Sequence, residues 1–159
     1  MPADFEVSPD ISDGINVGLM GLGVVGAGVA AHILSNGSSL LGLTGRTVNL
    51  KKVLVRDRFR VRDGELPEGV LTTNAEDILS DPDIDIVVEV MGGTYPAEDY
   101  LKQALAAGKH IVTANKEVMA KSGSELMTLA RDNNANLLFE ASVGGGIPGL
   151  LYTSPSPRD

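Results

Sequence analysis

The sequence predicts an α/β fold, a doubly wound parallel sheet with helices on both faces. Short runs rich in Val, Ile and Leu alternate along the chain with segments that suit helices. These runs are apolar on both faces, which is typical of strands in a parallel sheet buried between helices. A chain of 159 residues is long enough to form one domain with its own core.

The first third of the chain supplies two strands and the helix between them. Residues 15–20 (INVGLM) form an apolar run bounded by glycines, which predicts a buried strand. A turn at residues 21–26 opens a helix over residues 24–35, and Asn36-Gly37 closes that helix. Residues 48–56 (VNLKKVLVR) predict the second strand, which a charged segment follows.

The middle of the chain repeats this order. We expect Thr72 or Thr73 to cap a short helix that ends near Ser80, because Pro82 follows. Residues 84–91 (IDIVVEVM) are largely β-branched and apolar, which predicts a third buried strand.

Two more strands complete the predicted sheet. Pro96 suits the first turn of a helix that runs to residue 107, and Gly108 is placed to end it. The remaining expected elements are a strand at residues 110–113, one or two helical turns at 117–121, a helix at 124–133 and a fifth strand at 136–142.

Composition and charge exclude several functional classes. The net charge of −8 argues against a broad nucleic-acid-binding surface. The chain has no cysteine, which excludes a disulfide scaffold, a thiolate metal site and a cysteine nucleophile. No apolar run reaches the ~18 residues of a membrane span, and residues 1–14 form an acidic, mobile arm without the features of a signal peptide. We therefore expect a cytoplasmic protein without a membrane or nucleic-acid partner.

The most informative motif is a glycine-rich loop directly after the first strand. It has the pattern G-x-G-x-x-G and consists of Gly21, Leu22, Gly23, Val24, Val25 and Gly26. Between a strand and a helix, the first glycine allows the tight turn, the second lets a pyrophosphate approach the backbone, and the third lets helix and strand pack closely. N–H groups at the helix start would face the phosphates. The motif predicts a Rossmann-type dinucleotide-binding domain, with a plain glycine-rich turn as the alternative.

The end of the second strand bears on which dinucleotide is bound. An acidic residue there binds the adenosine ribose of NAD, whereas an arginine accommodates the 2′-phosphate of NADP. Arg56 comes first after the strand, so we favour NADP(H), and Asp57 keeps NAD(H) as the alternative. Three further arginines suit either a phosphate or ion pairs with neighbouring acidic residues: Arg58, Arg60 and Arg62.

Loops after the later strands lie at the same edge of a parallel sheet and are candidates for the rest of the site. Gly92 and Gly93 would let the backbone lie beside the nicotinamide ribose. Lys116 could reach the cofactor or a substrate oxygen, and an exposed lysine at a helix start is the simpler alternative. Glu140 is a carboxylate in an apolar strand, so it needs either solvent or a hard cation as its partner.

Five segments carry a family resemblance when they are taken together: GLGVVG, LVRD, IDIVVEVMGG, AGKHIVTANKEVMAKSG and FEASVGGGIP. In order and in spacing, over about residues 15–150, they resemble the N-terminal half of homoserine dehydrogenase. The family interconverts L-aspartate 4-semialdehyde and L-homoserine with NAD(P)H, in threonine, methionine and isoleucine biosynthesis. Its segments VTANKEVMA and EASVGGGIP are much more specific than the glycine motif, and they argue against a related semialdehyde or dihydrodipicolinate-type reductase.

The resemblance implies roles for individual residues. The family's dinucleotide loop matches residues 21–26, its ribose-phosphate arginine matches Arg56, and the cofactor and active-site lysine of its ANK motif matches Lys116. A structural sodium site, built from a glutamate and three backbone carbonyls, matches Glu140, Val143, Gly145 and Ile147. A small-molecule substrate and a homo-oligomer are implied for the intact enzyme.

The end of the sequence departs from the family pattern. Family members continue past GGGIP into a region that binds substrate, forms the dimer and carries the proton-transferring lysine. Residues 151–159 (LYTSPSPRD) do not resemble that continuation, so we expect residues 15–150 to be the cofactor domain and residues 151–159 an unrelated tail. We also expect exposed apolar surface at the last strand. A free-standing NAD(P)-binding module without catalysis is the alternative function.

We expect the purified 159-residue chain to bind cofactor and to oxidise homoserine at trace levels only, because the proton-transferring region of the family has no match in it. A steady-state assay of homoserine oxidation checks this, and clear turnover would contradict it.

Overall fold

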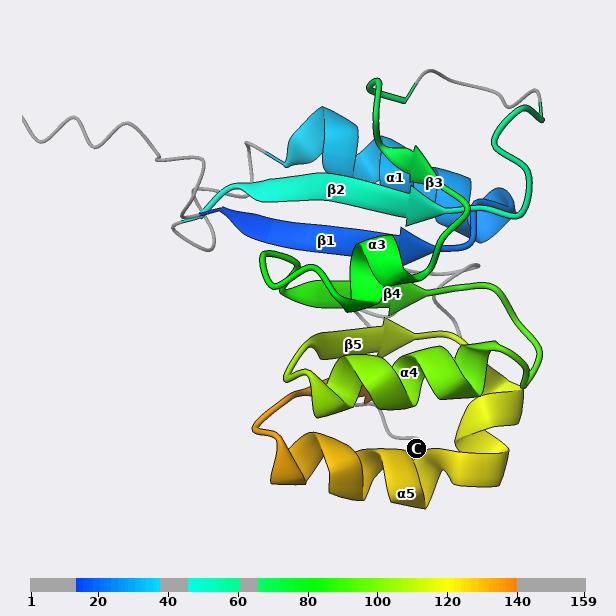
Figure 1. Cartoon of the computed structure of the whole chain (residues 1–159), viewed down its shortest axis with the longest axis vertical. Coiled ribbons are helices and arrows are strands. Elements are labelled where there is room, and N and C mark those ends of the chain that lie inside the picture. Colours follow the sequence, from blue (N-terminus) through cyan, green and yellow to red (C-terminus); the bar gives the residue numbers. More distant parts are fainter. Residues whose placement is uncertain (1–13, 38–45, 61–65, 140–159) are drawn as a thin grey trace, which may run out of the picture.

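The fold is built on one sheet of six parallel strands in the order β3-β2-β1-β4-β5-β6 (Figure 1). The structure is a computed structural model of the chain and describes residues 14–37, 46–60 and 66–139. The strands are β1 (Ile15–Met20), β2 (Val48–Leu54), β3 (Leu71–Thr72), β4 (Ile86–Glu89), β5 (His110–Thr113) and β6 (Leu137–Phe139). The helices are α1 (Val24–Asn36), α3 (Glu76–Leu79), α4 (Ala97–Ala106) and α5 (Lys116–Asp132).

The strand order reverses at the centre of the sheet. β1 pairs with β2 on one side and with β4 on the other, and all of these pairs are parallel. The chain first moves outward from β1 to β2 and β3, and then returns to the opposite side of β1 to continue through β4, β5 and β6. The carboxyl ends of the strands therefore meet at one edge, where the loops after β1 and β4 diverge, the position at which open α/β sheets bind ligands.

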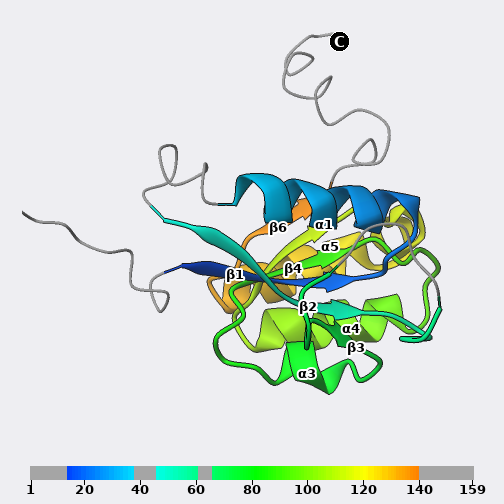
Figure 2. The same ribbon diagram turned by 90° about the horizontal axis from the view of Figure 1, so that it is seen from above.

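Helices cover both faces of the sheet, which confirms the predicted doubly wound α/β class. α1 lies on one face, and α3, α4 and α5 lie on the other (Figure 2). Ala30 of α1 packs in a core cluster with Val17 and Leu19 of β1. On the opposite face, Leu101 and Leu126 belong to a second core cluster under the sheet.

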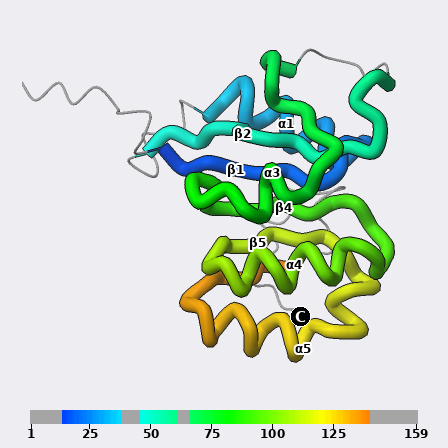
Figure 3. The backbone as a smooth tube through the Cα atoms, viewed as in Figure 1, coloured from blue at the N-terminus to red at the C-terminus, as the bar shows by residue number. Residues whose placement is uncertain are grey.

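α4 and α5 each bury a row of apolar side chains on one face, and these rows pack the two helices together. Leu101 and Leu105 are four residues apart in α4, and both are fully buried. In α5, Val118 and Leu126 are fully buried on one face of the helix. Figure 3 shows these two helices side by side along the sheet. Burying a side chain of this kind contributes roughly 1.5–3 kcal/mol, so the rows hold both helices to the sheet.

One prediction in the middle of the chain is wrong, and one strand has no counterpart among the predicted elements. The short strand β3 extends the sheet beside β2, and α3 begins only after it. Thr72 lies in β3, and neither it nor Thr73 caps α3. The Thr72 hydroxyl instead accepts from the N–H of Asn74 (3.0 Å) and donates to the carboxylate of Asp77 (2.5 Å). A strand of two residues has no periodicity, so the sequence pattern cannot show it.

The predicted helical turns at residues 117–121 and the predicted helix at 124–133 are one continuous helix, α5. Gly123 lies inside it, at a cost of about 1 kcal/mol relative to alanine. Burial of the apolar side chains on both sides of Gly123 outweighs that cost. Next to Gly123, the Ser122 hydroxyl also donates to Glu98 of α4. The remaining predicted elements agree with the structure to within two residues at each described end.

The last described strand carries exposed apolar side chains, as expected. Leu138 is 61% exposed and Phe139 is 38% exposed. Within the described ranges, no helix has the length and apolar character to span a membrane.

A buried lysine secures the amino-end edge of the sheet. Lys109 is only 5% exposed, and its ammonium group donates to the carbonyl oxygens of Asp81 (2.5 Å) and Ile84 (3.0 Å). Burial lowers the pKa of this ammonium group, and the nearby Asp81 carboxylate opposes that effect. The lysine thereby ties the start of β5 to the loop before β4.

We expect Lys109→Met to lower the free energy of unfolding by about 1–3 kcal/mol, because the Ile84 carbonyl loses its ammonium donor and the Asp81 carbonyl keeps only the N–H of Ile84. Urea denaturation measures this change. Lys102→Met is the matched control, since Lys102 makes an ion pair with Glu125 at the surface (3.2 Å) and its loss should matter little. Equal midpoints for the two variants would contradict the role of Lys109.

Candidate cofactor-binding site

The glycine loop after β1 has the tight geometry that its spacing predicts. Gly21 has φ +105°, a conformation that side chains disfavour. A Cβ at Gly26 would lie 2.1 Å from the carbonyl oxygen of Gly21, so only glycine lets α1 begin this close to the turn. Leu22 and Val25, between these glycines, are half-buried.

The start of α1 is open toward the edge where the strands end. Gly23 is its N-cap, and no side chain in the described ranges caps the helix or places an acid in its first turn. A Cβ at Gly23 would have no atom within 4 Å, and the Val24 side chain is 92% exposed. Free N–H groups and the positive end of the helix dipole therefore face open space, an arrangement that fits the pyrophosphate of a dinucleotide.

The loop after β4 contains two glycines in left-handed conformations. Gly92 has φ +78° and Gly93 has φ +74°. A Cβ at either position would meet no atom within 4 Å, so these residues leave the backbone of the loop uncovered.

A fully buried carboxylate lies beneath this loop. Glu89, the last residue of β4, accepts from the N–H groups of Met91 (2.9 Å) and Gly92 (3.3 Å). The Thr113 hydroxyl (2.6 Å) and the Asn115 amide (3.3 Å) also donate to it. Both carboxylate oxygens are thereby satisfied without solvent.

Asn115 joins the loops after β4 and β5. Its amide nitrogen donates to the Gly93 carbonyl (2.6 Å) as well as to Glu89, and its amide oxygen accepts from the N–H of Val118 (3.1 Å). The latter bond makes Asn115 the N-cap of α5. Lys116, the first residue of that helix, is exposed at the same edge of the sheet.

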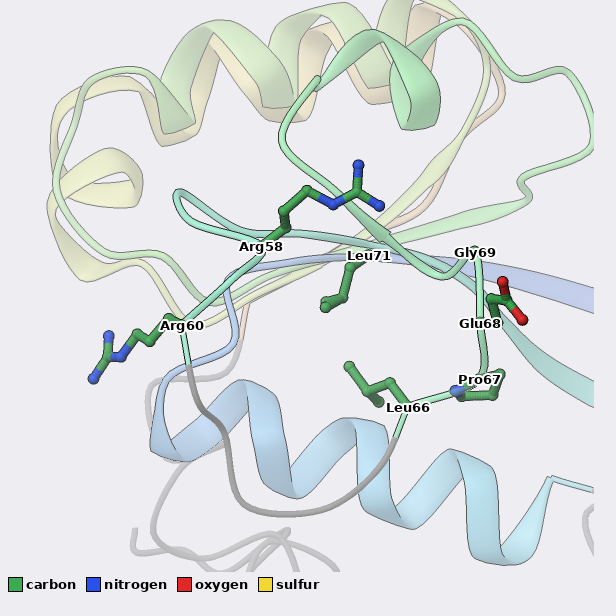
Figure 4. A pocket seen from close by; sticks show the side chains of 7 residues that line it. All are labelled: Arg58, Arg60, Leu66, Pro67, Glu68, Gly69 and Leu71. Atoms are coloured by element: carbon green, nitrogen blue, oxygen red, sulfur yellow. The ribbon is translucent and has the colours of Figure 1, made fainter.

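The described arginines after β2 differ in their surroundings. Arg56 is exposed and follows the buried Val55 directly at the end of the strand region. Arg58 lies over the ring of Phe59 at 5.9 Å. In Figure 4 the guanidinium groups of Arg58 and Arg60 point in different directions, away from the apolar side of a pocket of about 310 Å³ that also contains Leu66 and Leu71. Arg62 lies outside the described residues.

The sodium-site residues also lie outside the described residues: Glu140, Val143, Gly145 and Ile147. In the ranges that the structure describes, no group of three or more His, Asp or Glu side chains could hold a metal ion.

The sequence interpretation missed Glu89 and Asn115. The pattern that singles out Glu140, a carboxylate inside an apolar strand, applies equally to Glu89 in IDIVVEVM. Asn115 carries the N-cap pattern of a residue directly before a helix. The bond between the two depends on the pairing of β4 with β5, which the sequence does not specify residue by residue.

Comparisons with known proteins identify the family. The family model described as the NAD-binding domain of homoserine dehydrogenase matches residues 21–140. This chain belongs to the homoserine dehydrogenase family. Homoserine dehydrogenase of Bacillus subtilis is 49% identical over 134 residues, which cover 84% of this chain and 31% of that protein.

Solved homoserine dehydrogenases share the fold. The crystal structure of the S. aureus enzyme at pH 6.5 superposes with a TM-score of 0.76 at 39% identity, over 81% of this chain and 33% of that one. The enzyme from Thiobacillus denitrificans gives a TM-score of 0.73 at 41% identity, over 80% of this chain and 30% of that one. The chain thus spans about a third of the length of these relatives. It holds the nicotinamide-dinucleotide-binding domain of an oxidoreductase family.

The open space at Gly23 gives a direct test of the homoserine dehydrogenase glycine loop. We expect Gly23→Ala to lower the free energy of unfolding by no more than about 1 kcal/mol, because the added Cβ meets nothing in the protein and only the preference for glycine over alanine at the N-cap is lost. The same variant should weaken dinucleotide binding about tenfold or more, because the Cβ fills the space that the pyrophosphate needs. Isothermal titration calorimetry measures the binding, and differential scanning calorimetry measures the stability.

Gly28→Ala is the matched control in the same helix. A Cβ at Gly28 also meets nothing within 4 Å, but the residue lies further along α1. We expect unchanged binding and a gain of about 0.5–1 kcal/mol in stability. Equal binding by the two variants would show that the start of α1 does not hold the cofactor.

Proposed function

We propose that this chain is the cofactor-binding part of a homoserine dehydrogenase, which interconverts L-aspartate 4-semialdehyde and L-homoserine with NADP(H). The observation that carries the proposal is the uncapped start of α1 behind the GLGVVG loop, in a chain 49% identical to a homoserine dehydrogenase. The N–H groups at an exposed helix start without a side-chain cap are available to a phosphate ligand. The reaction serves threonine, methionine and isoleucine biosynthesis.

Each edge loop has a part in this proposal. The loop at residues 21–26, with Val24 and Val25, receives the pyrophosphate, and Arg56 receives the adenosine 2′-phosphate. Gly92 and Gly93 offer an uncovered backbone to the nicotinamide ribose. The nicotinamide, when bound, supplies or accepts the hydride.

The preference for NADP(H) over NAD(H) rests on the arginine at the end of β2. Arg56 is exposed, and its guanidinium fork suits a phosphate better than a ribose hydroxyl. Asp57, the competing candidate for a ribose contact, already accepts from the N–H of Phe59 (2.9 Å) within its own turn. This engagement favours Arg56 as the residue that meets the adenosine ribose.

Lys116 is proposed to serve the cofactor and the active site. A cation at a helix N-terminus is electrostatically unfavourable, so a negatively charged or oxygen-bearing ligand would stabilise it there. Two further proposals rest on the sequence: a structural sodium ion at Glu140, Val143, Gly145 and Ile147, and a homo-oligomeric intact enzyme with a small-molecule substrate. Trace turnover by the 159 residues alone stays a prediction.

We expect Arg56→Ala to raise the Kd for NADPH about tenfold or more and to leave the Kd for NADH within a factor of two, because only NADPH carries the 2′-phosphate. Calorimetric titration of both cofactors checks this.

Arg131→Ala is the control for a lost positive charge, because Arg131 is exposed in the last turn of α5. It should change neither Kd. A loss of affinity for both cofactors in Arg56→Ala would reject the assignment of Arg56 to the 2′-phosphate.

A further inference from the structure

The buried carboxylate of Glu89 has a larger set of partners than packing requires. The side chain has no exposed surface, yet it accepts four hydrogen bonds. Burying an ionisable group is costly unless donors compensate it, and an apolar side chain would fill the same space at no such cost. The donors must therefore be the reason for its presence.

These donors belong to two different loops. The N–H groups of Met91 and Gly92 come from the loop after β4. The Thr113 hydroxyl and the Asn115 amide come from the end of β5 and the loop that follows it. Both loops leave the sheet at the edge where its strands end (Figure 1). Glu89 thus fixes the distance between the two loops.

Asn115 extends this connection to the outer parts of both loops. Its bond to the Gly93 carbonyl holds the second left-handed glycine, and its cap on Val118 fixes where α5 begins. Lys116 follows directly, so the position of its backbone depends on the same side chain. Both N–H groups of the Asn115 amide donate in this bridge, and its oxygen accepts one bond.

The direction in which a dinucleotide lies across the sheet decides which half of it these loops meet. The pyrophosphate belongs at the start of α1, and the adenosine end belongs at the end of β2. Since β2 and β4 lie on opposite sides of β1, the nicotinamide end must extend toward β4 and β5. The two loops tied by Glu89 lie on that side of β1.

We propose that Glu89 is a positioning residue for the nicotinamide half of the cofactor: together with Asn115 it holds the loops after β4 and β5 in the shape that receives that half. The proposal rests on the cofactor-binding function proposed above. It assigns to Glu89 an effect on one end of the cofactor and none on the other.

The experiment compares whole cofactors with their adenosine halves. NADPH and NADH are titrated together with 2′,5′-ADP and ADP, which lack the nicotinamide. We expect Glu89→Met to raise the Kd for the preferred reduced cofactor about tenfold and to leave the Kd for its adenosine half within a factor of two. The enhancement of reduced-nicotinamide fluorescence on binding should shrink in parallel.

Glu89→Gln is the conservative rescue. Its amide oxygen has two lone pairs for the three donors that now meet one carboxylate oxygen, and its NH₂ group can donate to the Thr113 hydroxyl. We expect this variant to lose clearly less affinity for the reduced cofactor than Glu89→Met does.

Asn115→Ser decides the question if Glu89→Met does not fold. Serine is a good N-cap, so α5 keeps its start, but the amide bonds to Glu89 and Gly93 are lost. The expected result is the same selective loss of the nicotinamide half. Asp85→Asn is the control, because Asp85 is a half-buried carboxylate at the opposite edge that accepts from the N–H of Asn16 (2.8 Å). It should change no Kd.

Two results would overturn the proposal while leaving the cofactor function intact. One is an unchanged Kd for every ligand in the Glu89→Met or Asn115→Ser chain, and the other is an equal loss for the whole cofactor and its adenosine half. If the unchanged chain binds none of the four ligands, the proposed function itself fails and the role of Glu89 fails with it.

Discussion

A buried negative charge at the end of β4 sets the shape of the edge where the strands end. The Glu89 carboxylate has no exposed surface, so its charge must be compensated by protein donors. The N–H groups of Met91 and Gly92 donate to it directly after the strand. The chain then continues through Gly92 and Gly93 with positive φ angles. The carboxylate therefore anchors the start of the loop whose uncovered backbone follows.

The opposite edge of the sheet holds a buried positive charge, with a different consequence. Lys109 donates to two backbone carbonyls of the segment that precedes β4. The left-handed Gly108 (φ +80°) directly precedes it in the turn after α4. The two carbonyls lie in the short connection between α3 and β4, so the lysine stabilises the fold. At the other edge the partners of Glu89 are loops that face open space. The same principle, compensation of a buried charge, thus serves the fold at one edge and the candidate site at the other.

The parallel sheet makes it possible for one end of the strands to stabilise the fold and the other to hold the candidate site. Parallel neighbours require a crossover between strands, and each crossover brings the chain back to the same starting edge. The loops after β1, β2, β4 and β5 consequently share one edge although they are far apart in the sequence. Many unrelated functions use this arrangement, so the fold alone does not specify homoserine dehydrogenase chemistry. Membership of the homoserine dehydrogenase family rests instead on the sequence match over residues 21–140.

The sequence by itself determined the α/β class, the glycine loop and most helices and strands, because these depend on local periodicity and on glycines at fixed spacing. Gly21, Gly23 and Gly26 have structural positions that their spacing alone specifies. Tertiary structure decided the rest. β3 exists because β2 offers it a partner, and α5 continues through Gly123 because its row of apolar side chains is buried against α4 and the sheet. The Glu89 network joins residues 24 and 26 positions apart, through the register of β4 on β5. Contacts of that kind are set by strand pairing and burial, which a single sequence does not display.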